Sequence, residues 1–142
     1  MVQQILVPVD DSDPAREAIA FACEQFPDAS ITAIHVIHGP DFIIGHAQGA
    51  GEGFARSVEE GREAAEALLD EASEIAADHG VDIETKIARG QIERTVLDFV
   101  DEHDIDLVIV GSHGRTGLTR VTLGSVAEKI VRRSPVPVLV AR

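Results

Sequence analysis

Glycines and a serine in the last third of the chain have the spacing of a phosphate-binding loop. The apolar, β-branched run 106–110 reads as a buried parallel strand, and Gly111 follows it at once. Gly114 comes next, and after nine further residues Gly124 and Ser125 open a helical segment. A strand, a glycine loop and a helix start in this order predict a site for phosphate groups.

The physical reason is that a phosphate chain needs several donors that converge on a small volume. Glycine lets backbone N–H groups approach closely and adopts positive φ without strain. The first turn of a helix adds unpaired N–H groups and about half a positive charge. Turns at Gly111 and Gly124 would therefore hold a phosphate chain from two sides. The alternative is that these glycines only connect a strand to a helix.

Other catalytic motifs are absent from the sequence. It has no G-x-x-x-x-G-K-[ST] loop, and so no lysine that would assist phosphoryl transfer. It has neither G-x-G-x-x-G after its first strand nor a G-x-S-x-G elbow. His35 and His38 fall on opposite faces of a strand, so a shared metal is not expected. Asp10, His113 and Ser125 could be combined into a hydrolytic triad, but Ser125 is better explained as a helix-start hydroxyl.

Composition excludes several classes of protein. The 142 residues include 25 Asp and Glu against 12 Lys and Arg, a formal charge of −13 that repels nucleic acids and anionic membranes. Only Lys86 and Lys129 are lysines, a bias that resembles proteins of salt-rich cytoplasms, although an acidic mesophilic protein is the alternative. Cys23 is the single cysteine, which excludes an internal disulfide. Without a signal or membrane segment, we expect a cytoplasmic protein.

Strands and helices are predicted to alternate along the chain. Apolar runs predict strands over 3–9, 30–37, 81–87, 106–110 and 134–141, and helical periodicity predicts helices over 14–26, 57–79, 91–103 and 125–133. This alternation predicts an α/β fold with a doubly wound parallel sheet. The glycine-rich connection 39–53 is either a mobile lid or a dimer-specific arm. The apolar stripe of the longest helix is Ala64, Leu68, Ala72, Ile75 and Ala76.

The arrangement Gly111-x-x-Gly114, nine residues, Gly124-Ser125 resembles the signature of the ATP-binding branch of the universal stress protein family. The segment GSHGRTGL, residues 111–118, also looks like that family. The resemblance covers the whole chain and implies one universal stress protein domain over residues 1–142. It implies the strand order 3-2-1-4-5 of the adenine nucleotide alpha hydrolase-like folds, with helices on both faces. It also implies a homodimer formed through the last strand.

The resemblance implies a site for ATP with Mg²⁺ or Mn²⁺. Asp10 would lie near the ribose or a metal-bound phosphate, and the backbone of Val36 would meet adenine. His113 and Arg115 would reach the phosphate tail. The implied nucleotide-binding residues are Pro8, Val9, Asp10, Val36, Val110, Gly111, His113, Gly114, Arg115, Gly124, Ser125 and Val126.

Two features of the first turn leave alternatives open. Asp10 could instead cap the first helix together with Asp13. Where the family often has Asp-Gly-Ser, this chain has Asp10-Asp11-Ser12. The extra carboxylate of Asp11 would weaken phosphate binding unless it faces solvent or helps to hold Mg²⁺.

We therefore expect an ATP-binding regulatory or stress-response protein with at most slow hydrolysis and no assigned catalytic residue. One alternative is an enzyme, a slow ATPase or nucleotidyl transferase that uses the same cradle. Another is an interaction module that binds AMP or no nucleotide.

Overall fold

The computed structural model describes residues 1–38, 52–112 and 123–141. Within these ranges, five parallel strands form one sheet in the order β3-β2-β1-β4-β5. The predicted doubly wound sheet and its strand order are therefore confirmed. The strands are β1 (Gln4–Pro8), β2 (Ser30–Ile37), β3 (Glu84–Arg89), β4 (Leu107–Gly111) and β5 (Val138–Ala141). The helices are α1 (Asp13–Gln25), α3 (Glu52–Asp78), α4 (Ile92–Glu102) and α5 (Ser125–Arg133).

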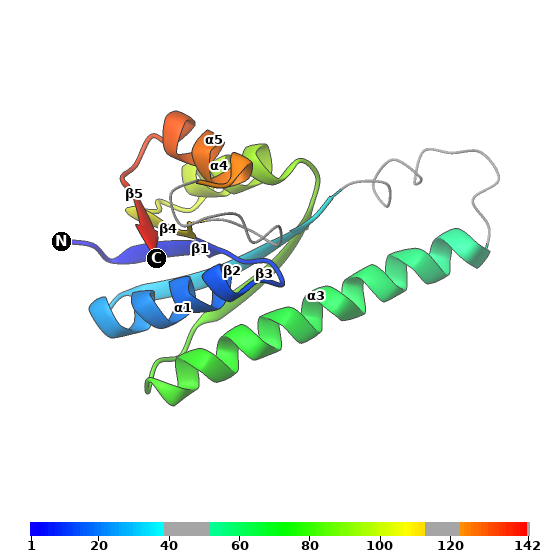
Figure 1. The fold of residues 1–142 in the computed structure, drawn as a ribbon, viewed down its shortest axis with the longest axis horizontal. Helices are drawn as coiled ribbons and strands as arrows, with labels where there is room; N and C mark the ends of the chain where they lie inside the picture. Colours follow the sequence, from blue (N-terminus) through cyan, green and yellow to red (C-terminus); the bar gives the residue numbers. More distant parts are fainter. Residues whose placement is uncertain (39–51, 113–122, 142) are drawn as a thin grey trace.

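Helices cover both faces of the sheet and enclose two separate apolar cores (Figure 1). On one face, α1 and α3 pack over Ile5, Val7 and Ile109. On the other face, α4 and α5 pack over Leu6, Val108 and Val110. Because successive side chains of a strand point to opposite faces, each central strand contributes alternate residues to the two cores. Cys23 of α1 is 2% exposed in the first core, where it packs as a small apolar residue.

The longest helix buries a stripe displaced from the predicted one. Its buried residues are Ala65, Leu69, Ala72 and Ala76, whereas Ala64 is exposed. Leu68 and Ile75 are half-buried at the border of the stripe. Both stripes have helical spacing, and only the position of the neighbouring helix decides between them. The helix ends at Asp78, one residue before the predicted end, and the φ of +73° at Gly80 lets the N–H of Val81 reach the carbonyl of Ala76 at 2.9 Å.

The largest differences from the predicted strand boundaries are at the starts of two strands. The third strand begins at Glu84, not at Val81, and the last strand begins at Val138, not at Ser134. Before the last strand, the hydroxyl of Ser134 accepts a hydrogen bond from the N–H of Val136 at 3.2 Å, which forms a local turn. Pro137 lacks an N–H, so the ladder of β5 becomes regular only after it.

Most of the glycine-rich connection 39–53 lies outside the described residues, so the lid and the dimer arm both remain predictions. Among the residues that are described, no helix is long and apolar enough to cross a membrane.

A carboxylate fixes the alignment of the two central strands. The Oδ2 atom of Asp106, just before β4, accepts hydrogen bonds from the N–H groups of Gln3 and Gln4 at 2.9 and 2.8 Å. The N–H of Asp106 donates in return to the carbonyl of Gln4 at 2.8 Å. The hydrogen bonds from Gln3 and then Gln4 stabilise the ionised carboxylate and lower the pKa of Asp106.

We predict that Asp106→Asn lowers the melting temperature at pH 7. A lowered pKa in the folded state means that the stabilisation is present above the unfolded-state pKa of about 3.9 and is lost as pH falls through the folded-state pKa. Thermal melts between pH 7 and pH 2 should therefore converge for wild type and Asp106→Asn at low pH. The control is Asp28→Asn, at an exposed position in the turn between α1 and β2, which should shift the melting temperature little. Equal melting temperatures for wild type and Asp106→Asn at pH 7 would contradict this role.

Candidate functional site

The carboxyl ends of the central strands meet at one edge of the sheet. β1 pairs on one side with β2 and on the other with β4, so the strand order switches at β1. Ligands of open α/β sheets bind at such a switch point. Pro8 is the last residue of β1, and Val9 and Asp10 follow it. Val110 and Gly111 end β4 at the same edge. The structure therefore brings these five predicted residues to the same edge of the sheet.

A hydrogen bond joins the end of β4 to the start of α5. The N–H of Gly124 donates to the carbonyl of Ser112 at 2.9 Å, so the chain leaves β4 and enters α5 at neighbouring points. Gly124 is the N-cap of α5, and its carbonyl accepts the first helical hydrogen bond, from Glu128. No side chain caps this helix within the described part of the chain. The first-turn N–H groups, on Ser125, Val126 and Ala127, therefore have no partner within the helix.

The two glycines at these ends are present for different reasons. A Cβ on Gly111 would lie 2.7 Å from the backbone C and O atoms of Pro14, at the start of α1. Helix α1 could not pack so closely on β4 with any other residue there. Gly124 has φ −61° and ψ 152°, a conformation open to any residue. The fold therefore requires glycine at 111, and the backbone conformation does not require it at 124. His113, Gly114 and Arg115 lie outside the described residues.

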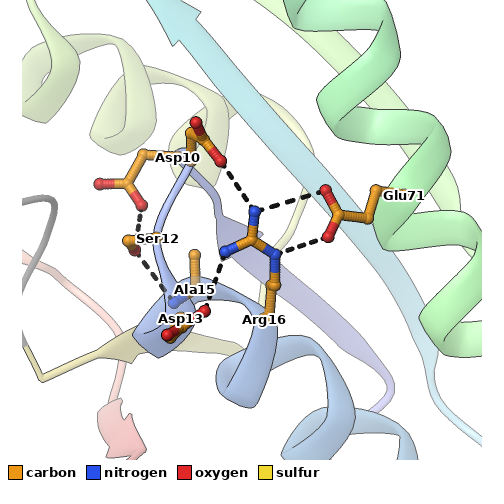
Figure 2. Close-up of polar contacts among 7 residues, drawn as sticks. Asp10, Ser12, Asp13, Ala15, Arg16 and Glu71 are labelled. Carbon is orange, nitrogen blue, oxygen red and sulfur yellow. Dashed lines mark hydrogen bonds and ion pairs between the residues drawn. The ribbon is translucent and has the colours of Figure 1, made fainter.

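Asp10 is held in place by the residue that caps α1. Ser12 is the N-cap, and its Oγ accepts a hydrogen bond from the N–H of Ala15 at 3.3 Å. The same hydroxyl donates its proton to Oδ1 of Asp10 (Figure 2). The alternative that Asp10 caps the helix together with Asp13 is therefore wrong, because Ser12 makes the capping bond. The side chain of Asp13 is 89% exposed. Asp10 is half-buried beyond the end of β1, with its carboxylate oriented by Ser12.

Arg16 gathers the other carboxylates around this turn. Its guanidinium lies 2.8 Å from Asp11, 3.1 Å from Asp13 and 2.6 Å from Glu71 of α3 (Figure 2). The hydrogen bonds that Arg16 donates to Glu71 first, and then to Asp11, raise the pKa of Arg16. The extra carboxylate of Asp11 is 67% exposed and faces this cation, which answers the question that the sequence left open. The sequence prediction missed Arg16 and Glu71. The three-residue spacing of Asp13 and Arg16 was a usable signal, but nothing local points to Glu71.

Val36 lies beside the end of β1. Ile34 pairs with Pro8, the last residue of β1, and Val36 comes two residues later in β2. Its side chain is 4% exposed in the core under α4 and α5, so its backbone is the part that faces the sheet edge. Val126 also contributes to that core from the first turn of α5.

A small cavity lies beside this edge, and no cluster of metal-ligating side chains occurs in the described ranges. The cavity next to Val9 and Asp10 lies between α1 and α3 and holds about 10 Å³, room for a single water molecule. Arg16 and Glu71 close its polar side. No group of three potential metal-ligating side chains occurs among residues 1–38, 52–112 and 123–141. A metal ion at this edge would need further ligands, such as phosphate oxygens.

The family model described as universal stress protein family matches residues 1–142 of this chain. Universal stress protein MJ0531 of Methanocaldococcus jannaschii is 34% identical over an alignment that covers 100% of this chain and 83% of that protein. The chain belongs to the universal stress protein family. The solved universal stress protein UspA from Lactobacillus plantarum is 27% identical, with a TM-score of 0.84 over 99% of this chain and 98% of that one. A universal stress protein from Arabidopsis thaliana with AMP bound has the same fold, at 20% identity and a TM-score of 0.70, over 98% and 90% of the two chains.

We predict that Arg16 and Glu71 are energetically coupled. Removing Arg16 leaves three carboxylates close together, so Arg16→Ala and Glu71→Ala should each lower the melting temperature, and the double variant should lower it by less than the sum. Salt screens such pairs, so the coupling should shrink from 0.1 to 1 M KCl. The matched control is the pair of Arg62 and Glu66, 3.1 Å apart and exposed within α3, where we expect almost no coupling. Additive effects for Arg16 and Glu71 at low salt would show that this contact does not tie α1 to α3.

Proposed function

We propose that this universal stress protein binds ATP at the edge formed by β1, β4 and α5, and acts as a nucleotide-dependent regulatory or stress-response protein. The observation that carries the proposal is the hydrogen bond between Ser112 and Gly124. It places the uncapped first turn of α5 beside the end of β4, close to the switch point at β1. First-turn N–H groups with the positive end of a helix dipole favour phosphate at that point.

Relatives of this fold support an adenine nucleotide as the ligand. The Arabidopsis protein has AMP bound, and two further solved universal stress proteins are in complex with cAMP and with dAMP. The triphosphate for this chain is proposed from the glycine pattern Gly111, Gly114, Gly124 and Ser125. Mg²⁺ or Mn²⁺ would accompany it, because four phosphate charges meet a chain of formal charge −13.

In this proposal the described residues have separate roles. Asp10, oriented by Ser12, would accept from a ribose hydroxyl or meet a metal-bound phosphate. The N–H groups of Ser125 and Val126 would donate to phosphate oxygens. Pro8, Val9, Val110 and Gly111 would form the wall of the crevice. His113, Gly114 and Arg115 keep the roles that the resemblance implies for them.

Two other functions remain in competition. A slow ATPase or nucleotidyl transferase would use the same residues and would differ by turnover above background. A module that binds AMP would prefer AMP to ATP in calorimetric titrations with and without Mg²⁺. We rank ATP binding without rapid turnover first, because the chain lacks a P-loop lysine.

We predict that Gly124→Val abolishes Mg-ATP binding and leaves the melting temperature nearly unchanged. The backbone of Gly124 already has a conformation that valine adopts, and a side chain there would crowd the anion. Gly111→Ala is the contrasting variant. Its Cβ would meet the backbone of Pro14 at 2.7 Å, so it should lower the free energy of unfolding by about 1–3 kcal/mol.

Isothermal titration calorimetry of wild type and Gly124→Val with Mg-ATP, together with thermal melts, measures both effects. Absence of heat and of any melting shift for wild type would refute nucleotide binding. Tight binding of Mg-ATP by a stably folded Gly124→Val would instead show that the first turn of α5 is not part of the site.

We also propose a homodimer that forms through β5, the edge strand beside β4. The N–H of Val108 donates to the carbonyl of Pro137, so the backbone groups of Pro137 and Leu139 point toward β4. Those of Val138 and Val140 therefore point outward along the free edge, where an antiparallel partner strand could pair. A cytoplasmic location and the absence of nucleic acid partners belong to the same proposal and rest on composition alone.

We predict that Val140→Pro converts the dimer into a monomer. Proline removes an outward N–H and leaves the ladder with β4 intact, whereas Leu139→Pro should disrupt that ladder and lower the melting temperature. Light scattering should give twice the chain mass for wild type and a single chain mass for Val140→Pro. A wild-type protein of single chain mass would exclude this dimer.

A further inference from the structure

The pairing of β1 with β2 stops one hydrogen bond earlier than the backbone would allow. The last paired residues are Pro8 and Ile34, and the N–H of Val9 still donates to the carbonyl of Ile34 at 2.9 Å. In a regular parallel ladder, the carbonyl of Val9 would next accept from the N–H of Val36. The structure has a different bond there. The carbonyl of Val9 accepts from the ring of His35, with Nδ1 at 2.8 Å.

This contact identifies the ring nitrogen of His35 that donates. A carbonyl oxygen only accepts hydrogen bonds, so Nδ1 must carry the proton. His35 lies between Ile34 and Val36 in the strand, and both of these neighbours point into the core under α4 and α5. By alternation, the ring of His35 points to the opposite face, the side of α1 and α3. From there it reaches across the strand end to the carbonyl of Val9.

The consequence concerns the backbone of Val36. The carbonyl of Ile34 accepts from the N–H of Val9 on the β1 side, and the carbonyl of Ile37 accepts from the N–H of Gly90 on the β3 side. Because the backbone groups of successive residues alternate between the two neighbouring strands, the N–H and C=O of Val36 point to the β1 side, as those of Ile34 do. Neither group has a partner among the residues that the structure describes. Unpaired backbone groups beside a buried side chain are costly unless water or a ligand satisfies them. A donor and an acceptor on one residue thus face the switch point.

The N–H and C=O of Val36 are complementary to the donor and acceptor of adenine. Adenine presents its exocyclic amino group, a donor, beside a ring nitrogen that accepts, either N1 or N7. Guanine has an oxygen in place of the amino group. Its carbonyl oxygen would face the carbonyl oxygen of Val36, and two acceptors cannot form a hydrogen bond with each other. A site that must satisfy buried polar groups rejects the wrong partner strongly.

We propose that His35 is a positioning residue that keeps the base-recognition groups of Val36 open. By occupying the carbonyl of Val9, the ring prevents β1 and β2 from closing the next rung of their ladder. The N–H and C=O of Val36 are then open to adenine, the contact that the resemblance to the family already implies for this residue. This inference rests on the proposed nucleotide site for its ligand, but its claim about the strand ends concerns the ligand-free protein as well.

The first test uses the ligand-free protein. His35→Leu removes the donor at similar size, and His35→Asn keeps an amide N–H at the place of Nδ1. The amide of Val36, followed by hydrogen exchange in NMR spectra, should exchange at least tenfold more slowly in His35→Leu than in wild type, because it then binds the carbonyl of Val9. His35→Asn should behave like wild type. Equal exchange of Val36 in wild type and a folded His35→Leu would overturn the role of His35.

The second test measures base recognition by calorimetry. ATP should bind roughly tenfold more weakly to His35→Leu than to wild type or His35→Asn, the size of one well-placed hydrogen bond. One of the two analogues 1-deaza-ATP and 7-deaza-ATP should bind wild type roughly tenfold more weakly than ATP does. The same analogue should bind His35→Leu with the affinity that ATP has for that variant. Full affinity of wild type for both analogues would refute recognition by Val36. If wild type binds no adenine nucleotide, the proposed function fails, and the exchange measurement still decides the role of His35.

Discussion

The parallel pairing of β1 with β4 is the constraint on which the candidate site depends. It places Asp10 and Gly111 at the same sheet edge, although about a hundred residues separate them in sequence. Helix α1 must then start directly over the end of β4, and the contact between Gly111 and Pro14 leaves no space for a side chain. The carboxylate of Asp106 holds the amino ends of the same two strands in register. The geometry at the carboxyl edge is therefore set by a close backbone contact at one end of the strand pair and by the Asp106 carboxylate at the other.

Local interactions made much of the fold predictable from the sequence. Ser12 caps α1, Gly80 ends α3, and the alternation of strands with helices identified every element in the described ranges. These features depend on neighbouring residues, whose chemistry a sequence displays directly. The strand order came only from the resemblance to a family, because periodicity does not say which strands pair.

The errors have a common physical origin in tertiary packing. The buried stripe of α3 moved from Ala64 to Ala65 because the helix rotates to fit α1 and the sheet, which its own periodicity does not determine. Arg16 and Glu71 stand 55 residues apart, and their ion pair exists only because α1 and α3 pack side by side. The bond from His35 to Val9 likewise replaces an expected backbone bond by a side-chain bond across two strands. This side-chain bond breaks a local rule at the candidate site, and exceptions to local rules are expected where a protein binds a ligand.

Local pairing controls the electrostatics of the edge more than the net charge does. At physiological ionic strength the Debye length is about 8 Å, so most carboxylates of a chain with formal charge −13 are screened from a ligand at the sheet edge. The turn after β1 carries three carboxylates beside this edge, and their arrangement matters. Asp11 and Asp13 face Arg16, together with Glu71, while Asp10 alone in this turn is turned toward the capping hydroxyl of Ser12. The turn therefore pairs two of its three carboxylates with Arg16 at the side of α3 and keeps one oriented beside the strand end. In the proposed function, an anion and its metal ion would meet that one carboxylate and the dipole of α5, so the proposed phosphate binding would not need a basic surface.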